Sequence, residues 1–400
     1  MKDTVKHSYS FYRPVYQTKE AIKSNIKNHP ASAIQQPGKI VVKGNYLFLN
    51  DIDRGIHIID VSDPTNPQKL SFIDIPGSMD LAVNGNYLYA DCYTDLVTLD
   101  ITDPLKVNVK QFINGVFPHR YYGSFFADTT QVIRKWVKVD TSITREYTGT
   151  FRSEIVFERS GMFFSPSSGF FASSFSGTAA IGVAGSTARF GLQQNRMYTV
   201  SHDDLKVFNI TKPEAPQYTS KIDLVQGNIE TIFPYKNNLF IGAQGGMFIY
   251  SASNPDQPSL LGQFTHVRSC DPVVADDTHA YVTLSGGTMC GGFSNQLDVV
   301  DIKNLTSPKL VKTYPLTSPK GLSKDGNTLL ICDGKDGLKL FDVANPSNVT
   351  HIKTIAGFEP HDIIALNGYA IAVASDGIYI VDYRQPQNAV VIGKLVVNKN

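Results

Sequence analysis

Charged side chains recur at one place in a repeated sequence pattern, and they are the residues best suited to form a polar site. Aligning the copies places one such residue in each first apolar run, namely Lys39, Asp80, Arg189, Glu230, Asp271, Lys320 and Asp362. Their signs nearly alternate. Opposite charges in a narrow, partly dry place neutralise one another, so a ring of ion pairs is one interpretation. A site for a small polar ligand is the other.

His361, which stands beside Asp362, is the histidine placed best for chemistry. Adjacent side chains in a strand point to opposite faces, so the pair is a weak signal for acid–base catalysis. The sequence has no spaced His or Cys cluster for a metal, no phosphate-binding P-loop and no GxSxG nucleophile elbow. We therefore predict no catalytic residues, no metal and no cofactor.

Aspartates also recur at the end of each third apolar run, just before a turn that usually contains proline. They are Asp60, Asp100, Asp301, Asp342 and Asp382, with Asn209 and Tyr250 in place of Asp in two copies. A short carboxylate at this position can accept the backbone N–H groups of its own turn. Because each belongs to a different copy, we interpret the five as structural and not as one multivalent site.

The elements that must position these residues are read from the repeat itself. Seven copies of about 40 residues each contain four short apolar runs separated by turns, a period that is typical of β-propeller blades. The sequence therefore predicts an all-β chain with a seven-bladed propeller of four-stranded blades over 37–400. It also predicts an N-terminal segment over 1–36, with Thr18 capping a short helix over about 19–27, and an insertion over 119–186.

The segments that depart from the repeat pattern concentrate on one face of this propeller. This face carries the links between blades and the loops between second and third strands. We call it the upper face. The insertion 119–186 and the long loop 285–295 both fall there. Irregular loops on a rigid scaffold are the usual place for binding. The upper face is therefore the predicted binding surface.

The insertion is rich in aromatic residues and contains the only tryptophan of the chain, Trp136. Such a segment must bury surface somewhere. It can pack on the propeller as a lid, or it can form an abbreviated extra blade, since 131–140 resembles a third strand. Alternatively, its aromatic side chains contribute to a ligand platform; they are Tyr121, Tyr122, Phe125, Phe126 and Trp136.

The third runs carry a resemblance to a known family. IHIIDVSDP (56–64), LVTLDITDP (96–104) and LKLFDVANP (338–346) resemble the LVIVD repeat, a β-propeller repeat of bacterial secreted and surface proteins. More narrowly, most of the chain resembles the LVIVD-repeat lipoproteins of Bacteroidetes, in which a lipobox cysteine normally precedes the segment that begins here near Met1. The resemblance implies an extracytoplasmic, lipid-anchored protein, and contact with the membrane only through that anchor.

Cys270 and Cys290 fall on the same face, at the start of the first strand and in the long loop of the fifth copy. With the implied extracytoplasmic address, a disulfide between them is expected. It would close a loop of about 20 residues and contribute roughly 3 kcal/mol of stability in the chain-entropy model. Mass spectrometry of unreduced peptides should find the two linked, and free thiols at both positions after oxidising preparation would contradict the pairing. Cys92 and Cys332 are expected to be buried thiols.

Charge composition narrows the classes of partner. The chain has 37 basic and 36 acidic side chains, a net charge of +1, so no global field attracts nucleic acid. We expect a noncatalytic extracytoplasmic binding or scaffolding module whose partner is a protein, a glycan or a small polar ligand. The alternative is a hydrolase or lyase with a polar site at the channel mouth.

Overall fold

The computed structural model describes residues 3–120, 122, 125, 130–147, 183–184, 188–224, 228–265, 272–286 and 294–397. By internal contacts the chain divides into two compact units. One comprises 1–25 and 119–169, and the other comprises 26–118 and 170–400. No helix among the described residues is both long enough and apolar enough to cross a membrane.

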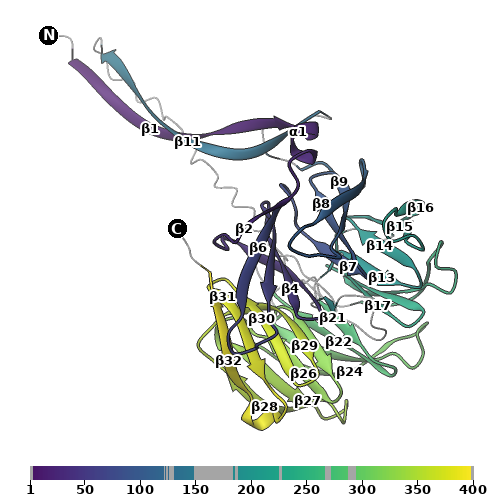
Figure 1. Ribbon diagram of the computed structural model, residues 1–400. Helices are drawn as coiled ribbons and strands as arrows, with labels where there is room; N and C mark the ends of the chain where they lie inside the picture. Colours follow the sequence, from purple (N-terminus) through teal and green to yellow (C-terminus); the bar gives the residue numbers. More distant parts are fainter. Residues whose placement is uncertain are drawn as a thin grey trace. The chain divides into compact units, whose positions relative to one another are not determined.

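The larger unit contains seven antiparallel sheets that follow one another along the chain (Figure 1). Blade one consists of β3 Pro37–Lys43, β4 Tyr46–Asp51, β5 Gly55–Asp60 and β6 Gln68–Asp74; blade two of β7 Leu81–Asn84, β8 Tyr87–Cys92, β9 Asp95–Asp100 and β10 Asn108–Ile113; and blade three of β13 Phe190–Gln193, β14 Arg196–Val200, β15 Asp204–Asn209 and β16 Gln217–Asp223. Blade four consists of β17 Ile229–Tyr235, β18 Asn238–Ala243, β19 Gly246–Ser251 and β20 Ser259–Thr265; and blade five of β21 Val273–Ala275, β22 His279–Leu284, β23 Gln296–Asp301 and β24 Lys309–Pro315. Blade six consists of β25 Leu322–Asp325, β26 Thr328–Cys332, β27 Leu338–Asp342 and β28 Thr350–Ile355; and blade seven of β29 Pro360–Leu366, β30 Tyr369–Ala374, β31 Gly377–Asp382 and β32 Val390–Val396. The predicted seven blades of four strands are confirmed.

The ring closes through its innermost strands. Each first strand contacts the first strand of the next blade, from β3 through to β29, and β29 contacts β3. All four strands of the last blade come from one continuous stretch of chain, so the ring closes without strand exchange. A Cβ at Gly393 in β32 would lie 2.1 Å from the Pro64 carbonyl oxygen of the first blade. The outer strand of blade seven therefore packs directly on a turn of blade one.

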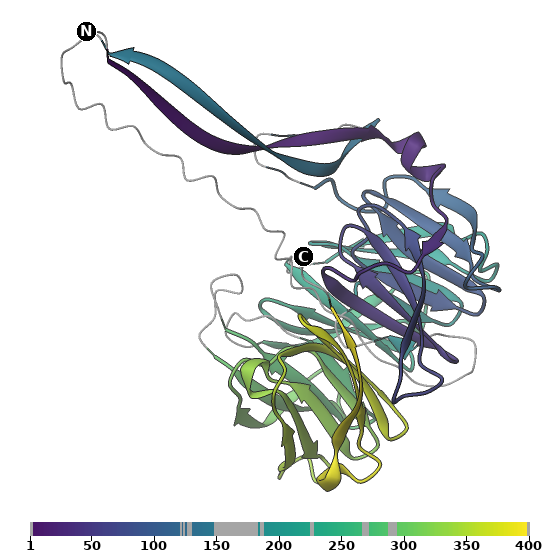
Figure 2. The same cartoon turned by 60° about the vertical axis from the view of Figure 1, so that its left-hand side comes forward.

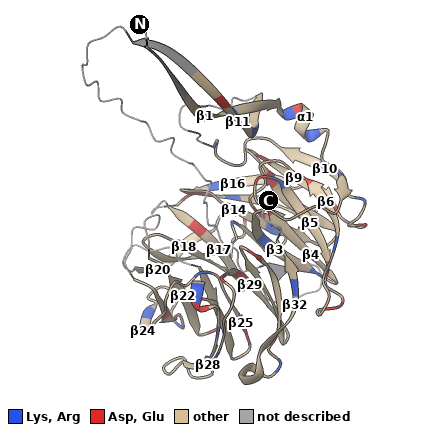
Figure 3. Cartoon of the chain, turned by 90° about the vertical axis from the view of Figure 1, so that its left-hand side faces the viewer, with Lys and Arg blue, Asp and Glu red and all other residues tan. Residues whose placement is uncertain are grey.

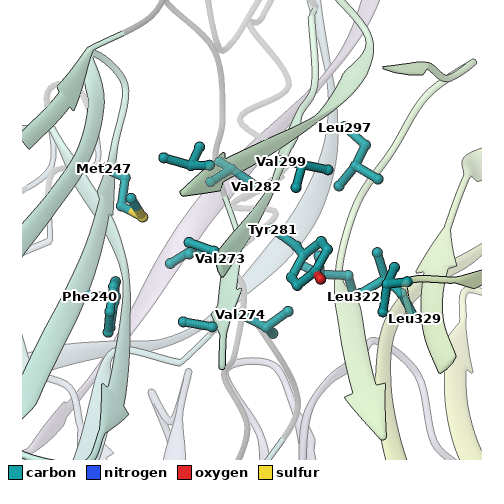
Figure 4. Close-up of a cluster of buried hydrophobic side chains, with 14 of the residues drawn as sticks. Phe240, Met247, Val273, Val274, Tyr281, Val282, Leu297, Val299, Leu322 and Leu329 are labelled. Atoms are coloured by element: carbon teal, nitrogen blue, oxygen red, sulfur yellow. The ribbon is translucent and has the colours of Figure 1, made fainter. Parts of the chain in front are cut away.

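Apolar side chains fill the spaces between blades. The cluster in Figure 4 joins blades four, five and six through residues such as Phe240, Tyr281 and Leu329. The strands supply β-branched and aromatic residues that alternate along the chain, so one face of each blade packs on the blade before it and the other on the blade after it. Gly246 begins a third strand at φ +149°, and a Cβ there would lie 2.3 Å from the Phe264 carbonyl oxygen of the fourth strand. Only glycine fits this close approach.

The recurrent aspartates have the predicted structural role. In every blade the residue that ends the third strand accepts a hydrogen bond from the backbone N–H two residues later, over 2.8–3.2 Å. The assignment of Tyr250 is wrong, because strand pairing puts Ser251 at this position and Ser251 Oγ accepts from the Ser253 N–H. A serine hydroxyl caps such a turn as an aspartate does.

The first blade is larger than predicted. β2 (Asn28–Pro30) pairs with β6, and β12 (Val183–Ala184) pairs with β3, which makes a six-stranded sheet. The Asn28 side-chain amide donates to the Pro104 carbonyl of blade two at 3.0 Å, and its oxygen accepts the Val107 N–H at 2.7 Å. Part of the N-terminal segment therefore fastens blade one to blade two.

The smaller unit is a two-stranded antiparallel ribbon (Figures 1 and 2). β1 (Asp3–Thr18) pairs with β11 (Gln131–Tyr147) along its whole length. The expected helical N-terminal segment is not supported. Only one turn, α1 (Lys19–Lys23), is helical, with Thr18 Oγ1 accepting the Ala21 N–H at 3.2 Å. The hypothesis that 131–140 forms a blade strand is also wrong, because β1 is its partner.

Candidate functional site

The predicted charged residues do gather on the larger unit, at the end of the first strands that faces the blade links. The members with described structure are Lys39, Asp80, Arg189, Glu230, Lys320, His361 and Asp362, and we call them the channel-mouth cluster. Asp271 and Tyr121 lie outside the described residues, as do Cys270 and Cys290, so their assignments remain predictions. Tyr122 and Trp136 belong to the smaller unit, where their ring centroids are 6.1 Å apart.

Strand pairing corrects the alignment of the cluster. In each blade, the fourth residue of the second strand pairs with a residue of the first strand, as Leu49 pairs with Ile40 in blade one. The equivalent position is the residue just before that partner. It is occupied by Lys39, Asp80, Arg189, Thr231, Pro272, Gly321 and Asp362. Glu230 and Lys320 lie one residue earlier. The predicted positions are therefore one residue off in these blades. In the fourth blade the cause is a bulge beside Glu230 at the entrance to the first strand.

Five members of the cluster form an arc of alternating charge over consecutive blades. Asp362, Lys39, Asp80, Arg189 and Glu230 come from blades seven, one, two, three and four, and four of the five are at most 6% exposed. Lys39 is attracted by Asp80 and Asp362, and Arg189 is attracted by Asp80 and Glu230. Since these groups are buried, each charge depends on its neighbours for compensation.

Asp80 ties two blades together directly. Its Oδ2 accepts the backbone N–H of Arg189 at 2.6 Å, and its Oδ1 accepts the N–H of Leu81 at 2.7 Å. Burial raises the pKa of Asp80, while Lys39 and these backbone donors oppose the rise. Burial also lowers the pKa of Lys39 to about 7, against the attraction of its two carboxylate neighbours. Both groups therefore ionise at a cost in desolvation.

His361 and Lys320 lie beside this arc. Burial lowers the pKa of His361 to about 4, with Lys39 and Lys320 adding to the effect. The imidazole is therefore neutral at neutral pH. Lys320 is half-buried, and its Nζ donates to Ser285 Oγ at 3.3 Å. A Cβ at Gly321 would lie 2.9 Å from Asp362 Oδ1, so glycine at this position makes room for the carboxylate of the next blade.

A second set of carboxylates on the upper face escaped the sequence prediction. Asp51 and Asp333, at equivalent ends of second strands, each accept two consecutive backbone N–H groups from the segment that enters their own blade. Asp91 does the same for Met79 and Asp80. Burial raises the pKa of Asp91 to about 7. These aspartates fix the segments that lead into the first strands, where the channel-mouth cluster lies.

Asp51 has the most extensive network of this second set. Its side chain is fully buried, and besides the Gln35 and Gln36 N–H groups it binds Arg54 Nη1 at 2.6 Å and His57 Nε2 at 3.1 Å. Burial alone would raise the pKa of Asp51, but hydrogen bonds from His57 and Gln36 and the charge of Arg54 hold it below its usual value.

The sequence does contain a signal for this second set. NDIDRGIH and CDGKDGLK each place an Asp at the end of a second strand and a basic residue six positions later. In the structure, His57 contacts Asp51 at 3.1 Å and Lys339 contacts Asp333 at 2.6 Å. The expected binding loop 285–295 has described structure only at its ends. No group of three or more His, Cys, Asp or Glu side chains within the described ranges could hold a metal ion.

Comparison with known proteins agrees with this architecture. The LVIVD repeat model matches residues 37–73, 77–113 and 280–315, which cover blades one and two and most of blade five. The structure is a β-propeller, and these three segments of it match the LVIVD repeat. The search of curated proteins found no match.

Solved structures show the same fold at low sequence identity. A protein from Lactobacillus plantarum is 12% identical, with a TM-score of 0.58 over 91% of this chain and 97% of that one. The computationally designed Ika8 protein is 11% identical, with a TM-score of 0.53 over 93% and 89%. A functionally unknown protein from Desulfotomaculum acetoxidans is 10% identical, with a TM-score of 0.50 over 92% and 100%. These similarities establish the fold alone.

Proposed function

We propose that the protein is a noncatalytic, extracytoplasmic binding or scaffolding module that contacts its partner through the upper face of the propeller. The single observation that carries the proposal is the buried arc of alternating charge from Asp362 to Glu230. Buried charges reduce stability unless they are compensated, and propeller blades are ordinarily joined by apolar contacts. A cluster of this kind at one end of the first strands is therefore a candidate for recognition of a polar group.

The opposite face offers no comparable feature among its described turns. Each strand-three to strand-four turn is closed by a backbone hydrogen bond, and in five of the seven blades an Asp or Asn side chain also accepts the N–H two residues later, as Asp63 does from Thr65 and Asp103 from Leu105. Acidic and basic residues are interspersed over the side of the propeller in Figure 3. The partner is a protein, a glycan or a small polar ligand. The extracytoplasmic address, with a lipid anchor in the full-length precursor, rests on the resemblance of the LVIVD repeats to those of Bacteroidetes lipoproteins.

Lys320→Met tests the proposal with little risk to the fold, because the Lys320 ammonium makes one long hydrogen bond at the rim of the cluster. The probes are a glycan array and a panel of amino acids, dicarboxylates and sugars screened by thermal shift. We expect Lys320→Met to weaken the binding of any ligand that these screens identify by about ten-fold or more, since a hydrogen bond to a charged group contributes about 1.5–3 kcal/mol. Asp103→Ala, in a turn of the opposite face, which we call the lower face, should leave binding unchanged.

Two results would contradict this function. Binding that survives Lys320→Met and is lost in Asp103→Ala would place the contact on the lower face. Turnover of a probe that disappears in His361→Ala, in a protein whose unfolding temperature is unchanged, would establish the hydrolase or lyase alternative.

A further inference from the structure

The β1–β11 ribbon has two chemically different faces. Residues directly opposite each other in an antiparallel pair share a face. The register opposes Phe11 to Val139, Arg13 to Val137 and Val15 to Lys135. Tyr9 lies on this side as well, because side chains two residues apart along a strand share a face. We call the five residues Tyr9, Phe11, Val15, Val137 and Val139 the apolar face of the ribbon.

The other face is more polar, although Tyr12 (50% exposed) and Trp136 (38% exposed) lie on it. It carries Ser10 opposite Asp140, Tyr12 opposite Lys138 and Pro14 opposite Trp136. The Phe125 ring packs edge-on against Trp136 at 5.3 Å, and Tyr122 lies 6.1 Å from it. Trp136 therefore has aromatic neighbours from its own unit.

Three of the five residues of the apolar face are exposed. Tyr9 is 46% exposed, Phe11 43% and Val137 37%, and the Tyr9 and Phe11 rings are 6.3 Å apart. Two strands alone cannot form a core that would bury such a row. Contiguous apolar surface of this kind on an ordered element marks an interaction site.

Charge identifies the kind of partner. Ser8–Thr18 and Gln131–Ser142 together contain four basic residues, Arg13, Arg134, Lys135 and Lys138, against one acidic residue, Asp140. Asp140 is itself paired with Lys138 at 3.3 Å. Arg13 and Lys135 lie among the apolar residues on the same face. The complementary surface is therefore anionic as well as apolar, and a second copy of this face would bring like charges together.

We propose that the apolar face of the ribbon docks on the interfacial layer of an anionic lipid bilayer. Aromatic rings are favoured at the headgroup level, and Lys and Arg beside them are attracted to anionic lipids. The outer edges of β1 and β11 carry backbone groups that need water, so the ribbon lies among the headgroups and does not enter the hydrocarbon. This proposal concerns the smaller unit and does not depend on the ligand of the propeller.

The test uses the full chain and sedimentation with vesicles of phosphatidylcholine, alone or mixed with phosphatidylglycerol. We expect sedimentation with the mixed vesicles and a strong loss on raising salt from about 0.1 M to about 1 M, because the Debye length falls from about 10 Å to about 3 Å. Trp136, the only tryptophan, lies on the opposite face and should be quenched little by brominated lipid, whereas a protein with Phe11→Trp and Trp136→Phe should be quenched strongly, which reports contact through the apolar face.

Matched variants separate the two faces. Tyr9→Ser combined with Phe11→Ser should weaken binding by about ten-fold or more, because buried aromatic area is lost. Tyr12→Ser, on the opposite face and 50% exposed, should change it by less than about two-fold. Arg13→Gln with Lys135→Gln should weaken binding by about five-fold for each charge. Lys303→Gln with Arg384→Gln, which makes the same change in net charge on the propeller, should not.

Three outcomes would overturn the proposal. The first is equal sedimentation with neutral and anionic vesicles, or none with either. The second is equal loss in the Tyr12 variant and in the Tyr9 and Phe11 variant. The third is a lipid-independent dimer in analytical ultracentrifugation that dissociates in the Tyr9 and Phe11 variant, which would assign the face to a second copy. Far-ultraviolet circular dichroism and the unfolding temperature confirm that each variant remains folded.

Discussion

Asp51→Ala is expected to lower the free energy of unfolding by about 3–5 kcal/mol, because it leaves several buried donors without an acceptor. The Gln35 and Gln36 N–H groups, Arg54 and His57 all bind this one carboxylate. Removing one side chain therefore breaks the hydrogen bonds at the entrance to the first blade as well as the ion pair with the partly exposed Arg54. Chemical denaturation followed by circular dichroism measures the loss, and calorimetry should show a lower unfolding temperature.

Asp60→Ala is the matched control for this variant. Asp60 lies in the same blade and accepts one backbone N–H in an accessible turn, from Ser62 at 2.8 Å. Its removal should cost about 1 kcal/mol or less. Equal effects of the two substitutions would show that the Asp51 network does not hold the blade entrance.

Lys39 is expected to make the propeller more stable as the pH rises from about 7.5 to 9.5. The pKa of this lysine is about 7 in the folded protein and 10.5 as its reference value. Over this interval the unfolded chain holds the Lys39 proton and the folded chain has released it, so unfolding takes up a proton and stability increases with pH. One proton over two pH units corresponds to on the order of 2–3 kcal/mol.

Lys39→Met should remove this gain, so the measured quantity is the difference in pH dependence between the two proteins. Without Lys39, the carboxyl group of Asp80 loses an attractive charge and protonates more readily, which changes the slope in the same direction. Lys339→Met is the control. Salt bridges to Asp333 and Asp336 outweigh burial and raise the pKa of Lys339, so this variant should lose stability yet keep the slope. Parallel pH profiles for wild type and Lys39→Met would refute the assignment.

The sequence was sufficient to predict the propeller because the same constraints repeat in every blade. The residue at the end of each third strand, such as Asp100, has to accept the backbone N–H of the next turn, and this need is visible as a recurring Asp. The general position of the charged cluster also followed from alignment of first strands. Its members could not all be placed, because a bulge at the start of a strand shifts the register by one residue without changing the hydrophobic pattern.

The ribbon could not be predicted, and the blade-entrance aspartates were missed, for different reasons. β1 and β11 are more than 100 residues apart in sequence, and neither is a copy of the repeat, so no periodic signal connects them. Thr18 is a good N-cap, and local propensity alone then favours a helix longer than the single turn that forms. Asp51 and Asp333 were visible as acidic loop residues with a basic residue six positions later, but this pattern does not show that each carboxylate also accepts two backbone N–H groups of its blade entrance.

Because the ring closes without strand exchange, its architecture depends on the cyclic order of the blades and not on which blade comes first in the chain. The four propeller strands of each blade come from one uninterrupted segment, and Gly393 of blade seven packs on Pro64 of blade one. A circular permutant that begins at another blade link would preserve the strand ladders within all seven blades. Because each blade keeps its own strand ladder, the link between blades two and three can contain a long insertion while both blades keep four strands. Such a scaffold can acquire an appendage at a link without redesign of its core.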